Sequence, residues 1–134
     1  MAVVDASVYL AAVLVSDKNH KVSKAWLDSL INSNDRFSAP AIILSEVAAP
    51  ISRAFNQPTQ AKRLVHSMMN AKFIDLVPVT IPLANRAAII AADYKIRGCD
   101  SIYVALAEAL NEDLITWDRQ QRERAKSLIN AYHP

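Results

Sequence analysis

The sequence predicts an α/β protein built on a mainly parallel sheet with helices on both faces. Short apolar runs of strand length alternate with longer stretches of helical periodicity along the 134 residues. A strand joined to the next strand through a helix makes a crossover, and crossovers connect parallel strands of one sheet. The length suits one compact domain over residues 1–134, and there is no repeat, low-complexity segment or linker.

Apolar spacing and the residues that begin or end helices place each element. Strands are expected over residues 2–5, 36–39, 73–79 and 114–117. Helices are expected over residues 8–15, 20–32, 41–55, 58–71, 82–96, 100–111 and 119–128. The tail over 129–134 is expected to form a last edge strand or to fray.

The first elements rest on a short apolar run and the polar residue after it. Val3 and Val4 form a run too short to be amphipathic, which indicates a buried strand. Ser7 can cap the helix that follows. In the second helix, Trp26 and Ile31 lie near one face, so that face is expected to be packed.

Four prolines mark boundaries or an irregularity. Pro40 follows the second strand, and Pro58 and Pro82 each open a helix, where a missing N–H is tolerated. Pro50 lies inside the third helix, and its ring crowds the carbonyl group four residues back, which belongs to Glu46. A kink or a break is therefore expected there.

The second half of the chain has clearer periodicity. Ile102, Leu106 and Leu110 are spaced at i, i+4 and i+8 on the sixth helix, which begins after a tight link at residues 97–99. The run over 114–117 is apolar, and a helical pattern follows it directly. This pattern favours a buried strand that passes straight into a helix.

Composition excludes several classes of protein. The only glycine is Gly98, which excludes a glycine-rich phosphate loop or dinucleotide site. A single cysteine, Cys99, cannot form an internal disulfide, which indicates a reducing, cytoplasmic setting. The longest apolar run, Val8 to Val15, spans 8 residues, too few to cross a membrane. The net charge of +2 is too small to indicate a nucleic-acid partner by itself.

Four acidic residues occupy positions where a catalytic or metal-binding site is expected. Asp5 and Asp118 each end an apolar strand, so they are adjacent at the carboxyl edge of the sheet if the two strands are neighbours. Asp100 lies in the first turn of an apolar helix. Glu46 interrupts an apolar helix, where a carboxylate needs a partner or a metal.

This set of carboxylates favours a hard divalent cation, Mg²⁺ or Mn²⁺, because both bind oxygen ligands. No His/Cys set has zinc-ligand spacing, and no Ser-His-Asp constellation is visible. Structural roles remain open for each acid. Asp118 can be a plain helix cap, Asp100 can complement the helix dipole, and Asp5 can be a turn residue.

Taken together, these residues resemble the PIN domain, a metal-dependent nuclease fold, and more narrowly the VapC-type toxins. The resemblance spans nearly the whole chain, in the order and within the length usual for the family. Its matching segments are Val3-Val4-Asp5-Ala6-Ser7, Ser45-Glu46-Val47, Cys99-Asp100-Ser101-Ile102-Tyr103-Val104-Ala105-Leu106-Ala107 and Leu114-Ile115-Thr116-Trp117-Asp118.

The resemblance implies a three-layer α/β/α sandwich that cleaves RNA with Mg²⁺ or Mn²⁺. It implies that the site is an acidic quartet supported by two polar residues; these are Asp5, Glu46, Asp100 and Asp118, with Ser7 and Thr116. It also implies a small antitoxin partner and a homodimer. Many relatives carry a further acid shortly after the last aspartate, whereas here none occurs before Glu123, which leaves the number of metals open. The alternative function is a stand-alone or catalytically weak PIN-like module that binds RNA or protein.

Basic residues surround the expected site and suit a phosphate backbone. The candidates for RNA binding are Arg53, Arg97, Arg119 and Arg122. Two alternatives remain open: the last helix can be a solvated surface paired with Glu123, and Arg53 can pair with Glu46. Cys99 is expected to be buried. Tyr103 is expected to pack on the sheet, with lining of the site as the alternative.

Overall fold

The computed structural model describes residues 1–134 and contains one five-stranded sheet of order β3-β2-β1-β4-β5. Every neighbouring pair of strands is parallel, which confirms the predicted α/β class. The strands are β1 (Ala2–Val4), β2 (Phe37–Pro40), β3 (Ile74–Val77), β4 (Asp113–Ile115) and β5 (Ala131–Tyr132). The chain therefore does form the last edge strand that was one of two expectations for its tail.

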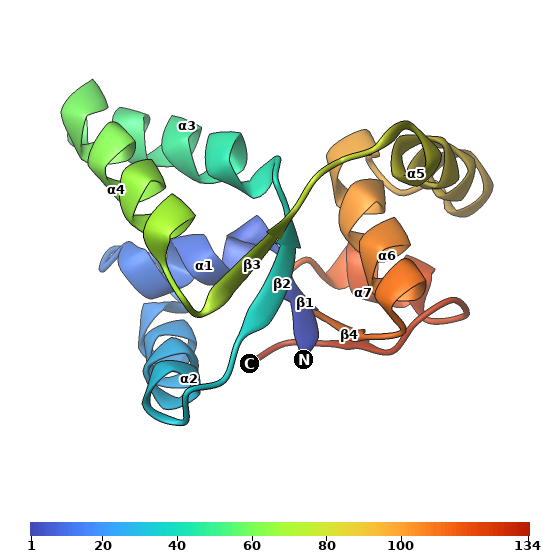
Figure 1. Ribbon diagram of the computed structural model, residues 1–134, viewed down its shortest axis with the longest axis horizontal. Helices are drawn as coiled ribbons and strands as arrows, with labels where there is room; N and C mark the ends of the chain where they lie inside the picture. Colours follow the sequence, from blue (N-terminus) through green and yellow to red (C-terminus); the bar gives the residue numbers. More distant parts are fainter.

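Helices cover both faces of the sheet. They are α1 (Ala6–Val13), α2 (His20–Asn32), α3 (Ile43–Phe55), α4 (Pro58–Asn70), α5 (Ile81–Tyr94), α6 (Gly98–Leu110) and α7 (Arg119–Ala125). Figure 1 shows the first four helices on one side of the strands and the last three on the other. The result is a three-layer α/β/α sandwich. No helix combines the length and apolar character needed to cross a bilayer.

One hydrophobic core lies between these layers. Val3 and Val4 in the central strand are fully buried, as expected for a strand covered on both faces. Phe37 on β2 contacts the rings of Tyr9 and Trp26, with centroids 6.4 and 6.1 Å away. Trp26 therefore packs on the core, as predicted for its helix face.

The register between β1 and β4 positions the site. Val3 pairs with Leu114 and Val4 with Ile115, and the Asp5 N–H donates to the Ile115 carbonyl at 3.0 Å. Both strands end at the same edge of the sheet. The residues that follow them, Asp5 and Thr116, are consequently neighbours.

Several local expectations were wrong. α3 is continuous from Ile43 to Phe55, so of the two outcomes expected at Pro50 the break does not occur, and a kink stays a prediction. Ser7 is not the cap of α1: Asp5 is, and its side chain accepts from the Ser7 N–H. Cys99 is exposed rather than buried, because it lies in the first turn of α6 outside the core.

The chain makes its tight turns almost without glycine. Four non-glycine residues have positive φ: Asn34, Asn56, Lys95 and Asn111. The last three directly follow α3, α5 and α6, where a left-handed residue ends a helix. Asparagine tolerates this conformation better than most residues, so one glycine suffices for the fold.

Candidate active site

Asp5 lies at the carboxyl end of the central strand and is almost entirely buried. Its Oδ2 atom accepts hydrogen bonds from the Ser7 N–H (3.2 Å), the Ser7 hydroxyl (2.5 Å) and the Thr116 hydroxyl (3.0 Å). None of these bonds reaches Oδ1. Burial raises the pKa of Asp5, the bonds from Ser7 and Thr116 partly offset this, and the charge of Asp100 raises it further.

Ser7 and Thr116 connect the segments that follow β1 and β4. The Ser7 hydroxyl accepts from the Trp117 N–H at 3.1 Å, and the Thr116 hydroxyl accepts from the Asp118 N–H at 3.1 Å. Each hydroxyl thus contacts Asp5 and also fixes the backbone beside Asp118. The structure brings both predicted supporting residues to the site.

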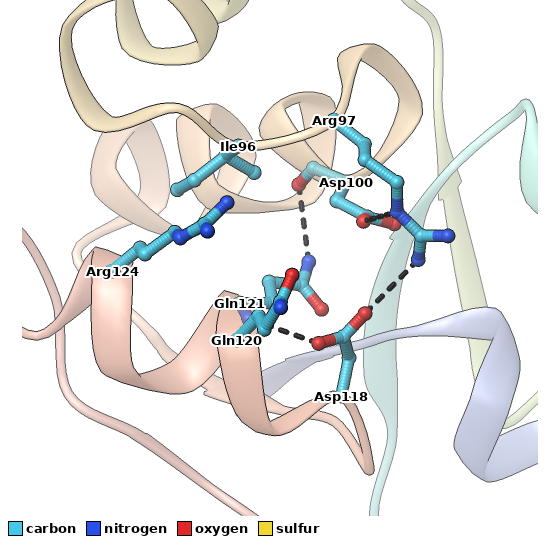
Figure 2. Close-up of a pocket in the computed structure, with 7 residues that line it drawn as sticks. All are labelled: Ile96, Arg97, Asp100, Asp118, Gln120, Gln121 and Arg124. Carbon is cyan, nitrogen blue, oxygen red and sulfur yellow. Dashed lines mark hydrogen bonds and ion pairs between the residues drawn. The ribbon is translucent and has the colours of Figure 1, made fainter.

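Asp100 and Asp118 are joined by one arginine. Arg97 donates from Nε to Oδ2 of Asp100 at 2.7 Å and from Nη2 to Oδ2 of Asp118 at 2.9 Å, as Figure 2 shows. Asp118 also caps α7, because its Oδ1 accepts from the Gln121 N–H at 3.0 Å. The hydrogen bond from Arg97 to Asp100, with the charges of Asp100, Asp118 and Asp5, raises the pKa of Arg97.

Glu46 reaches the same region from α3, although Pro50 lies one turn further along that helix. Its Oε2 accepts from the hydroxyl of the fully buried Tyr103 on α6, at 2.5 Å. Burial raises the pKa of Glu46, the Tyr103 bond lowers it, and the charges of Asp5 and Asp100 raise it further.

The four carboxylates therefore lie within one electrostatic environment. The charge of Asp100 acts on Asp5, the charges of both act on Glu46, and Arg97 interacts electrostatically with all four acids. They come from four separate segments of the chain.

Two further residues belong to the site. Tyr103, for which packing on the sheet and lining the site were both considered, is buried and also donates to Glu46. Gln121, buried on α7, donates from Nε2 to the Asp100 carbonyl at 3.1 Å and accepts from the Thr116 hydroxyl at 2.8 Å. No sequence pattern marks Gln121, because its neighbours Gln120 and Arg122 are polar as well.

The chemistry of these side chains fits a hard cation, although their arrangement is not a ready-made cage. No three His, Cys, Asp or Glu residues surround a point where an ion could bind. All four donors are nevertheless carboxylates, the ligands that Mg²⁺ and Mn²⁺ prefer. The hydrogen bonds to Asp5 leave Oδ1 free, and the bond from Tyr103 occupies only Oε2 of Glu46.

The four candidate RNA-binding arginines have different surroundings. Arg97 lies between two site carboxylates, and Arg122 donates to the Thr116 carbonyl at 2.6 Å. Arg119 pairs with Glu123 at 2.7 Å on the exposed face of α7, which matches the alternative of a solvated helix. Arg53 is exposed, and the ion pair considered with Glu46 does not form, since Glu46 bonds to Tyr103 instead.

The structure is therefore that of an α/β protein with an acidic site at the carboxyl edge of its parallel sheet. The family model described as "PIN domain" matches residues 2–127, and the chain belongs to the PIN-domain family. A comparison with curated protein sequences found no match.

Solved structures share the fold at low sequence identity. FitAcB from Neisseria gonorrhoeae has a TM-score of 0.74 at 21% identity, over 100% of this chain and 98% of that one. VapC20 from Mycobacterium tuberculosis, described as a sarcin-ricin loop cleaving toxin, has a TM-score of 0.76 at 16% identity, over 90% and 92%. VapBC2 from Rickettsia felis, bound to a promoter DNA fragment, has a TM-score of 0.71 at 15% identity, over 98% and 97%.

Proposed function

We propose that this protein is a metal-dependent endoribonuclease of the cytoplasm and the toxin of a type II toxin–antitoxin pair. The observation that carries the proposal is the convergence of Asp5, Glu46, Asp100 and Asp118 at one edge of a PIN-domain sheet. The similarity to VapC20, which is described as a sarcin-ricin loop cleaving toxin, supports the same class of activity.

We assign the four carboxylates as ligands of Mg²⁺ or Mn²⁺. A bound divalent ion supplies an acidified water and holds a phosphodiester for in-line attack. Asp5 contributes its free Oδ1, while Ser7 and Thr116 hold Oδ2. Glu46 would hold the same cation; burial raises its pKa, and the hydrogen bond from Tyr103 lowers it.

The proposal includes protein partners. One similar structure is described as a toxin-antitoxin complex from Klebsiella pneumoniae, which supports a small antitoxin for this chain. An apolar pocket between α1, α3 and α4, lined by Val13, Ile51, Phe55 and Leu64, is a surface that an antitoxin helix can cover. Phe55 is 53% exposed there. We propose a homodimer as the toxin's own assembly.

RNA cleavage with and without metal tests the enzymatic part. We expect cleavage in Mn²⁺ or Mg²⁺ that stops with EDTA, and that is lost in Asp5→Asn and Asp100→Asn while circular dichroism shows an intact fold. Cleavage that survives both EDTA and the two substitutions contradicts the proposal.

A second candidate is a PIN-like module that binds RNA or protein without turnover. The Arg97 bridge favours it, because the guanidinium takes two of the acids that a metal would use. A thermal melt separates the two functions, since a ligand that binds the native state raises the melting temperature. A metal-dependent nuclease shifts at millimolar Mn²⁺, whereas a module that lacks a metal site does not.

The partner is tested by co-expression with any small protein that the gene immediately upstream encodes. We expect a complex that inhibits cleavage and that Phe55→Asp weakens, because a buried charge opposes docking on an apolar surface. If the complex forms equally well with Phe55→Asp, the antitoxin binds another surface of the protein.

A further inference from the structure

We propose that Arg97 is an internal competitor of the metal, whose guanidinium holds Asp100 and Asp118 and must leave both carboxylates before a divalent cation binds them. This inference rests on the proposed function, and it adds a regulatory role for a residue of the chain itself.

The first argument is the number of free oxygens on Asp118. Its Oδ1 accepts from the Gln121 N–H, and its Oδ2 accepts from Arg97. The Gln121 N–H belongs to the first turn of α7, so it moves only with the helix. Arg97 is therefore the partner that Asp118 gives up when it takes a metal.

The second argument is the placement of the guanidinium. A single planar group bonds Oδ2 of Asp100 and Oδ2 of Asp118, which come from the starts of two different helices (Figure 2). A cation between these two aspartates would occupy the same space. Both ligands carry positive charge, and the acids that attract one attract the other.

The third argument is that Arg97 is free to leave. Its side chain is 76% exposed, whereas those of Asp100 and Asp118 are only 13% and 26% exposed. An exposed ion pair is weak, so its loss costs little free energy. The long flexible stem can move the guanidinium into solvent while the backbone remains in place.

A purely structural role for Arg97 does not account for the contacts. Two other bonds hold α7 in place here: Gln121 donates to the Asp100 carbonyl in α6, and Arg124 donates to the carbonyl of Lys95, the residue that ends α5. The position of α7 therefore does not depend on Arg97 alone. What Arg97 adds is a positive charge between the two carboxylates.

Direct measurement of Mn²⁺ binding, without RNA, tests the inference. Isothermal titration calorimetry of the purified protein is expected to show roughly three- to tenfold tighter binding for Arg97→Gln, the gain from removing weak exposed ion pairs. Arg124→Gln is the matched control, because it removes the same charge from the same pocket without touching an acid. Its affinity is expected to equal that of the wild type.

Each result has one meaning. Unchanged or weaker binding by Arg97→Gln overturns the competition, as does an equal gain in both variants, which would be a general charge effect. If the wild type binds Mn²⁺ and cleaves RNA but Arg97→Gln gains nothing, only the competition is wrong. If neither protein binds Mn²⁺, both the competition and the proposed metal dependence are wrong.

If Arg97→Gln does not fold, a second variant, Arg97→Lys, tests the same inference. Arg97→Lys keeps the charge but replaces the two-pronged guanidinium by a single ammonium, so it cannot hold both carboxylates equally well. We expect Mn²⁺ affinity between those of the wild type and Arg97→Gln. Affinity no higher than that of the wild type contradicts the inference.

Discussion

The Thr116 hydroxyl lies 3.0 Å from Oδ2 of Asp5, although 111 residues separate the two in the sequence. The same hydroxyl lies 2.8 Å from Oε1 of Gln121 and accepts from the Asp118 N–H. It has one proton for two acceptors, so Asp5 and Gln121 share it. Thr116 is fully buried, so no water can replace these bonds readily.

Thr116→Val is expected to destabilise the protein by about 1–3 kcal/mol, because it leaves buried polar groups without partners at nearly unchanged volume. Urea unfolding with EDTA present measures the effect. Thr116→Ser keeps the hydroxyl and is expected to recover most of the loss. Equal stability of the valine variant and the wild type would show that the hydroxyl does not serve this network.

Asp5→Asn is expected to stabilise the metal-free protein at neutral pH, on the order of 1 kcal/mol, the usual scale for relieving a functional site. The folded-state pKa of Asp5 is raised above its unfolded value, so the folded protein binds the proton more tightly. Stability is then lost as pH rises from the unfolded toward the folded pKa. Asparagine has no such proton to lose.

The pH dependence gives this prediction its control. The difference between Asp5→Asn and the wild type is expected to vanish below about pH 4, where the unfolded carboxyl is also protonated. Excess Mn²⁺ is expected to reverse the order, because only the wild type keeps the full ligand. An asparagine variant less stable than the wild type in EDTA at pH 7 would refute the assigned cost of burying Asp5.

Tyr103→Phe is expected to move the acidic limb of the pH–rate profile for RNA cleavage to higher pH. The Tyr103 hydroxyl donates to Glu46 and lowers its pKa, so its removal raises the pKa further. More alkaline conditions are then needed to ionise Glu46. Tyr9→Phe is the matched control, since Tyr9 is also buried but packs on Phe37. If Tyr103→Phe and Tyr9→Phe have identical pH–rate profiles, the Tyr103 hydroxyl does not influence the ionisation that limits cleavage.

Pro50→Ala is expected to stabilise the protein by about 2–2.6 kcal/mol. Alanine restores an N–H for the Glu46 carbonyl and removes a helix-interior proline, whose cost is about 3 kcal/mol. The gain is reduced because proline also limits the freedom of the unfolded chain, an effect of about 0.4–1 kcal/mol. Urea unfolding measures the change, and a loss of stability would indicate that α3 depends on the proline.

The pattern of the sequence was enough to place the strands and helices, because short buried runs and 3.6-residue spacing are local features. Pro50 shows the limit of such reasoning. Val47 and Ile51 bury the same face of α3 before and after the proline. Their packing holds the helix together where local hydrogen bonding alone would end it.

The acidic residues were predictable, but their partners were not. Asp5 and Asp118 stand at strand ends, which sequence spacing reveals. The contact between Glu46 and Tyr103 joins residues 57 positions apart on two helices that cover opposite faces of the sheet. The role of Arg97 likewise depends on how α6 and α7 meet, and no single sequence pattern encodes that meeting.

The order of the strands also has a consequence for biosynthesis. β1, made first, lies in the middle of the sheet beside β4, and Asp5 and Thr116 stand 111 residues apart. A ribosome therefore releases Asp5 long before the segment that completes its surroundings exists. The four carboxylates of the site cannot act together until translation has passed Asp118. Any activity that needs all four of them therefore begins only after almost the whole chain has been made.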